Sequence, residues 1–155
     1  MPSTFIQHRL IENDELNDKE QKWLASAIAG AVISDRHVTS SQMSWLHEAV
    51  SFLDQNDADT LISQMKTGSI PVLEKLSIKD RDKAARIFLD LVMIIMENMS
   101  ISKSEAHFIT EAAKKLGIQE HRAHKILTWA HDLLHRFKMR DSFVKFIAED
   151  DVIYQ

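Results

Sequence analysis

The segments ISDRHVTSSQ (residues 33–42) and MENMSISKSE (residues 96–105) decide the fold. In each, an apolar stretch ends at an acidic residue or its amide, a short polar turn follows, and Ser or Thr is followed three residues later by Gln or Glu. That last spacing is a capping box, which marks a helix N-terminus because the two residues satisfy each other's backbone N–H groups. Each segment therefore predicts the turn of a helical hairpin.

The two segments belong to a longer repeat whose offset is 63 residues, the separation of Asp35 and Asn98. Apolar positions match on both sides of the turns without a gap. We therefore expect two pseudo-symmetric helical hairpins, at about 18–54 and 81–117, that pack their apolar first helices against each other. Chance similarity between two amphipathic hairpins is the alternative. The matched pairs include Leu24 with Ile87, Ile28 with Leu91, Trp45 with Phe108, Leu46 with Ile109, and Leu53 with Leu116.

The whole sequence predicts a single all-α domain, residues 1–155, with about seven helices. Only 3 Gly and 2 Pro occur in 155 residues, which favours helices because both residues destabilise helix interiors. The repeat region covers about 18–138, and a C-terminal helix and tail occupy 139–155. The expected elements are a helix at 18–34, one capped by Thr39, a short one capped by Asp57, a brief helical segment from Pro71 to Leu76, a long helix from Asp80 to about Glu97, one between Ser102 and Gly117, and two at about 119–138 and 141–149.

Composition excludes several classes of function. The absence of Cys rules out disulfides, thiolate zinc sites and cysteine nucleophiles. A formal charge of −4 predicts no broad attraction to nucleic acid or anionic lipid. The longest apolar run, Leu91 to Met96, is far shorter than the ~20 residues that cross a bilayer, and the first residues lack the apolar stretch of a secretory signal. We expect a cytoplasmic protein without membrane insertion and, since no nucleophile motif, phosphate loop or HExxH sequence occurs, no enzymatic activity.

The repeated motif resembles the TerB-like domain of tellurite resistance and the related N-terminal region of membrane-anchored DjlA-type co-chaperones. The resemblance covers roughly residues 18–138. It implies an all-α domain without established enzymatic chemistry and a part in bacterial resistance to tellurite and other chemical stress. It also implies metal binding through acidic residues near the helix junctions. On this basis we expect a non-catalytic protein that acts in a stress or metal-related response through contacts with another protein.

The family pattern is only partly present. Asp35 matches the acidic turn residue of the family, but its counterpart in the second hairpin is Asn98. Glu105 matches the family's Glu, but its counterpart is Gln42. Without the family's glycine, the turns lack a residue that adopts a left-handed conformation at no cost, although Asn98 tolerates one. The glycine that follows the acidic residue in the family is replaced by Arg36 and Met99.

The residues at the two hairpin junctions form one candidate metal site. Hard divalent cations such as Ca²⁺ or Mg²⁺ prefer carboxylate oxygens, and the pseudo-symmetry would bring the junctions together. The alternative is that these residues only end helices and complete capping boxes, because the two amides weaken attraction for a cation. The candidate ligands are Asp35, Glu97, Asn98 and Glu105.

Histidines on the predicted helix at 119–138 form a second candidate site. His121, His124, His131 and His135 share one stripe at helical spacing, opposite the apolar face. His131 and His135 have the i,i+4 spacing by which two imidazoles can share Zn²⁺, Ni²⁺ or Cu²⁺. The alternative is a solvent-facing stripe whose charge grows below neutral pH.

The C-terminal segment 139–155 is the candidate partner surface. Its apolar residues have no place in the repeat, so they could contact another protein or a second copy of the chain. Deleting this segment should abolish such binding with little loss of helix, whereas unfolding on deletion would place it in the core. Nucleic-acid binding is the weaker alternative, because basic residues of the last helices do not form a compact recognition unit. The apolar residues are Phe143, Val144, Phe146 and Ile147.

Overall fold

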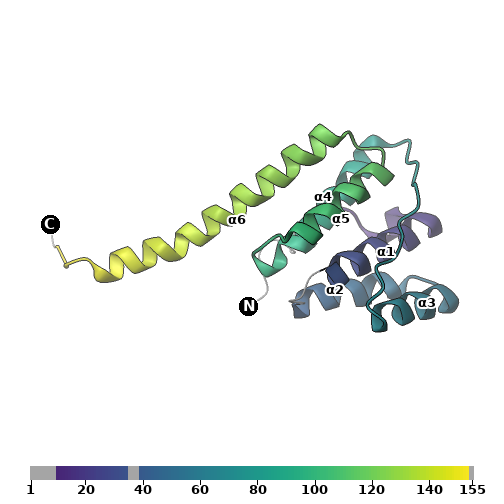
Figure 1. The fold of residues 1–155 in the computed structure, drawn as a ribbon, viewed down its shortest axis with the longest axis horizontal. Coiled ribbons are helices and arrows are strands. Elements are labelled where there is room, and N and C mark those ends of the chain that lie inside the picture. The colour runs from purple at the N-terminus through teal and green to yellow at the C-terminus, as the bar shows by residue number, and fades with distance from the viewer. Residues whose placement is uncertain (1–9, 35–38, 154–155) are drawn as a thin grey trace.

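Six α-helices and two short 3₁₀ helices make up the computed structural model, which describes residues 10–34 and 39–153 (Figure 1). No strand occurs in these two ranges, so the predicted all-α class is confirmed. The elements are η1 (Asn13–Glu15), α1 (Asp18–Ser34), α2 (Ser40–Ser51), α3 (Gln55–Lys66), α4 (Arg81–Ile95), η2 (Met96–Asn98), α5 (Lys103–Lys115) and α6 (Glu120–Glu149).

Helices α1 and α4 form the centre of the core. Helix α1 is buried on nearly every side, mainly through Ala residues, and α4 buries its Ile and Phe residues and Leu91. Helix α5 approaches α1 closely because Gly30 has no side chain: a Cβ built there would lie 2.5 Å from Cε2 of the Phe108 ring. Helices α2 and α5 add Trp45, Leu46 and Ile109 to the same cluster.

Both predicted capping boxes are present. Thr39 Oγ1 accepts a hydrogen bond from Gln42 N (3.1 Å), and Gln42 Oε1 accepts one from Thr39 N (3.0 Å). Ser102 Oγ accepts from Glu105 N (3.1 Å), and Glu105 Oε1 accepts from Ser102 N (2.9 Å). Helices α1 and α2 begin at residues 18 and 40, and α4 and α5 begin at residues 81 and 103.

The segment between α3 and α4 is not helical, so the prediction of a helix from Pro71 to Leu76 is wrong. Leu73, Leu76 and Ile78 are buried while the residues between them are exposed, and the chain runs across the body in an extended form (Figure 1). Its backbone also bonds to other elements, because Leu76 N donates to Lys115 O (2.9 Å). Asp57 does not cap α3; the cap is Asp54, whose Oδ1 accepts from Asp57 N (2.8 Å).

The C-terminal segment forms one helix instead of the two expected at about 119–138 and 141–149. Helix α6 runs without a break from Glu120 to Glu149 because no Gly or Pro interrupts it. Its first half packs on α5 through four buried residues, and its second half projects beyond the body (Figure 1). In the part of the chain that is described, no helix combines the length and apolar character needed to cross a bilayer. The four buried residues are Ala123, Leu127, Ala130 and Leu134.

Candidate protein-interaction surface

Three of the four predicted junction ligands lie in the described part of the chain. Asp35 lies outside the described residues. Glu97 and Asn98 lie in η2, which follows α4 directly, and Glu105 lies in the first turn of α5. Glu105 is 1% exposed, and its Oε1 is engaged in the capping box. Within residues 10–34 and 39–153, no group of three or more His, Asp or Glu side chains could hold a metal ion, so a junction site that includes Asp35 stays a prediction.

The left-handed residue of the second junction is Met99, not Asn98. Met99 has φ 65° and ψ 18°, and it follows the last residue of η2. Asn98 instead closes the turn with its side chain, because its Oδ1 accepts a hydrogen bond from Ser100 N (3.1 Å). Met99 therefore occupies a position whose backbone conformation favours glycine.

The two histidines of the alternative metal site lie on the exposed side of α6. His131 and His135 are both exposed, and the continuous helix gives them the expected i,i+4 relation. A cation held there would have two imidazole ligands from this chain, because the described residues supply no third one nearby. The pair could bind a transition metal weakly or share it with another molecule.

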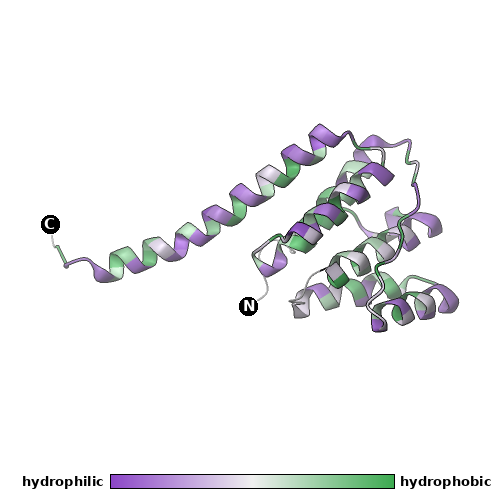
Figure 2. Ribbon diagram, in the orientation of Figure 1, coloured by the Kyte–Doolittle hydropathy of each residue, from purple (hydrophilic) through white to green (hydrophobic). Residues whose placement is uncertain are grey.

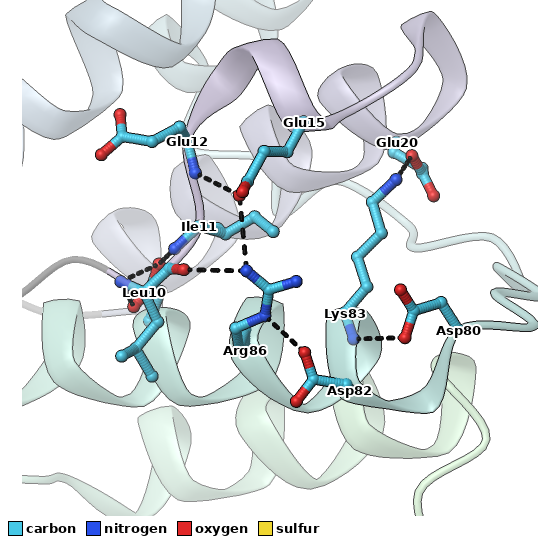
Figure 3. Close-up of polar contacts among 10 residues, drawn as sticks. Leu10, Ile11, Glu12, Glu15, Glu20, Asp80, Asp82, Lys83 and Arg86 are labelled. Carbon is cyan, nitrogen blue, oxygen red and sulfur yellow. Dashed lines mark hydrogen bonds and ion pairs between the residues drawn. The ribbon is translucent and has the colours of Figure 1, made fainter.

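A cluster of charged residues that sequence reasoning missed ties the chain before α1 to α4 (Figure 3). Asp90 is buried, and its carboxylate accepts hydrogen bonds from Leu10 N (2.9 Å to Oδ1) and Ile11 N (2.9 Å to Oδ2). One helical turn earlier, Arg86 Nη1 donates to Leu10 O (3.3 Å), and its Nε pairs with Asp82 (2.9 Å). The only signal in the sequence is one carboxylate, Asp90, inside the otherwise apolar stretch 87–95.

A second link in this cluster joins the start of α1 to α4. Lys83 Nζ lies 2.6 Å from Glu20 Oε1, and both side chains are largely buried. Glu20 also accepts a hydrogen bond from Asn17 N (2.9 Å) through the same oxygen. These charged groups bond to the backbone and side chains of other elements of this chain, so we interpret the cluster as part of the fold.

The projecting half of α6 carries an exposed row of large apolar side chains. We call this row the α6 stripe; it consists of Met139, Phe143, Phe146 and Ile147. These side chains are between 39% and 73% exposed. Apolar positions recur along the projecting part of the helix in Figure 2. Val144, which lies beside the stripe, is exposed too, so all four apolar residues named for this segment are exposed.

The α6 stripe does not continue the face by which α6 packs on the body. At 3.6 residues per turn, Phe143 and Met139 lie on nearly the opposite side of the helix from Leu127 and Leu134. Trp129, which is 47% exposed, lies on the same side as the stripe. A straight α6 therefore cannot turn the stripe toward α5 while its first half stays packed.

Charged residues flank the stripe with opposite signs at its two ends. Arg136 and Arg140 lie on the stripe's side of the helix toward the body, and Arg140 lies 5.6 Å from the centre of the Phe137 ring. Asp150 directly follows the helix and falls on the same side, with Glu149 and Asp151 as neighbours. The surface is therefore basic at one end, apolar in the middle and acidic at the other end.

Comparison with protein-family models, with curated proteins and with solved structures gives no match for this chain. The TerB-like resemblance therefore depends on the repeated motif alone.

Proposed function

We propose that this protein is a non-catalytic helical interaction module that captures another protein chain through the α6 stripe. The observation that carries this proposal is the position of the stripe on a helix half that projects from the body and faces away from the packed side. The folded body, residues 10–34 and 39–134, then serves to hold the projecting helix at a fixed angle.

The lack of packing on the outer half of α6 favours a binding partner. Residues 139–149 are all exposed, so packing on the body does not stabilise this end of the helix, and helix ends without packing fray. Burying a half-exposed Phe side chain removes roughly 100 Å² of surface from water, worth about 2.5 kcal/mol. A partner that covers the stripe would therefore stabilise both the helix and the complex.

We also propose that the chain is a TerB-like protein of two pseudo-symmetric hairpins, acting in the cytoplasm of a bacterium in response to tellurite or other chemical stress. Three features support this proposal. The capping boxes recur at the offset of the motif, the helix bounds recur with them, and Met99 adopts the conformation that suits the family's glycine. Partner capture by the stripe is compatible with such a role but does not depend on it.

Metal binding is a second candidate function, favoured by the burial of Glu97 and Glu105 at the second junction. A ligand present at 100 times its Kd adds about 2.7 kcal/mol to the folded state. The thermal midpoint of untagged protein should then rise with Ca²⁺ or Mg²⁺ over EDTA, and Asp35→Ala should abolish the rise. A Zn²⁺ or Ni²⁺ effect lost only in His131→Ala would place the ion on α6. No rise with any ion would contradict both metal sites.

Site-specific photo-cross-linking tests the interaction module. A photoreactive amino acid at Phe146 lies in the stripe, whereas the same group at Lys145 points to the other side of the helix. We expect cross-linked adducts with a protein chain from Phe146 and few from Lys145 in cells that express the protein. Equal yields from both positions, or none from Phe146, would contradict the proposal.

A further inference from the structure

We propose that the chain captured by the α6 stripe is a second copy of this protein, and that the two helices pair antiparallel about a two-fold axis near Phe143. This inference rests on the proposed function and names its partner. A two-fold dimer uses the same surface on both copies, so the surface must be complementary to itself.

The charges of α6 meet this requirement in the antiparallel arrangement. Arg136 precedes Phe143 by as many residues as Asp150 follows it, so each would lie about 10 Å from the axis. Antiparallel pairing about Phe143 therefore sets Arg136 of one copy opposite Asp150 of the other, twice. Parallel pairing would set like charges against each other and is disfavoured.

The apolar positions match in the same register. Phe143 lies opposite its own copy, Met139 lies opposite Ile147, and Phe146 lies opposite Arg140. A guanidinium over an aromatic ring is a favourable contact. Arg140 already makes such a contact within one copy, 5.6 Å from the Phe137 ring centre.

The area of the α6 stripe sets how tightly two copies can bind. A standard interface buries about 800 Å² on each partner. The stripe and its flanking side chains would bury about 1,000 Å² over both copies, at the lower limit for a specific interface, so we expect a micromolar dimer.

The competing occupant is an anionic membrane surface, since the stripe adjoins Arg136 and Arg140. An interfacial helix of that kind carries basic residues along its polar face. Here Glu149, Asp150 and Asp151 follow the stripe directly, and they would be repelled by anionic lipid. The acidic end therefore favours a second copy.

Sedimentation equilibrium of the full chain from about 1 to 200 µM tests the pairing with a charge swap. The wild-type protein should pass from monomer to dimer over this range. Arg136→Asp and Asp150→Arg should each weaken the dimer about ten-fold or more, because each sets two like charges together. The double variant Arg136→Asp with Asp150→Arg should recover to within about three-fold of wild type. Lys138→Asp carries the same charge change on the far side of the helix and should change the affinity less than about two-fold.

A wild-type chain that stays monomeric over the whole concentration range would overturn this inference. So would a double variant whose loss of dimer affinity equals the sum of the losses in the two single variants. Vesicles with anionic lipid identify the membrane alternative, because Asp150→Arg would strengthen vesicle binding while weakening a dimer. A monomeric chain that still cross-links to a different protein from Phe146 overturns the self-pairing and leaves the interaction module standing. A chain that neither dimerises nor cross-links overturns both.

Discussion

Gly30 determines how closely α1 and α5 approach. A methyl group there would overlap the Phe108 ring, whose Cε2 would be 2.5 Å away. We therefore expect Gly30→Ala to lower the free energy of unfolding by about 1–3 kcal/mol, even though Ala favours helices. Urea denaturation measures the change. Phe108→Leu in the same chain should recover part of the loss, and additive losses in the double variant would show that the ring is not the cause.

Asp90 holds the chain before α1. Asp90→Ala removes the acceptor of three hydrogen bonds from Leu10 N and Ile11 N, so the free energy of unfolding should fall by about 2–4 kcal/mol. Asp82→Asn in the same helix is the control, because its side chain is 78% exposed and surface ion pairs contribute at most about 1 kcal/mol. Equal losses in the two variants would contradict the role given to Asp90.

Single residues were the hardest features to predict from sequence. The capping residues were predictable because their hydrogen bonds join neighbours three positions apart. The role of Asp90 was not, since Leu10 and Ile11 lie about 80 positions away along the chain. Asp35 lies outside the described residues, so the junction metal site stays a prediction.

Among the elements, helix boundaries followed from local signals, and the errors have two physical causes. The segment at 69–79 is extended because burial of Leu73, Leu76 and Ile78 and a hydrogen bond to the end of α5 outweigh local preference. In α6, the apolar side of the helix changes near Phe137. The helical spacing of apolar residues is interrupted at this point although the backbone continues, and this interruption predicts two helices where the structure has one.

The second half of α6 should be dispensable for the fold. A chain ending at Lys138 loses only exposed residues of the helix, so its thermal midpoint should stay within about 3 °C of the full chain. Circular dichroism should show a loss of helical signal that corresponds to the removed residues alone. A chain ending at Gly117 is the matched comparison and should be much less stable, because it also loses buried residues such as Leu127 and Leu134. Unfolding of the first truncation would place the stripe in the core.

At the scale of the whole molecule, a compact body carries a long helix that extends beyond it (Figure 1). The 30 residues of α6 span about 45 Å, whereas a compact chain of this length, with a radius of gyration of about 15 Å, is about 39 Å across. The central claim is that the outer half of this helix is a binding surface and not a part of the folded body.

Hydrogen exchange at two protein concentrations tests that claim most directly. At about 1 µM, amides of residues 139–149 should exchange far faster than those of residues 123–134 in the same helix, because only the latter are packed. At about 200 µM, with the stripe covered by a second copy, exchange at 139–149 should slow while 123–134 stays unchanged. Equal, strong protection of both halves in dilute protein would contradict the account, since it would mean that the stripe is already buried in the monomer.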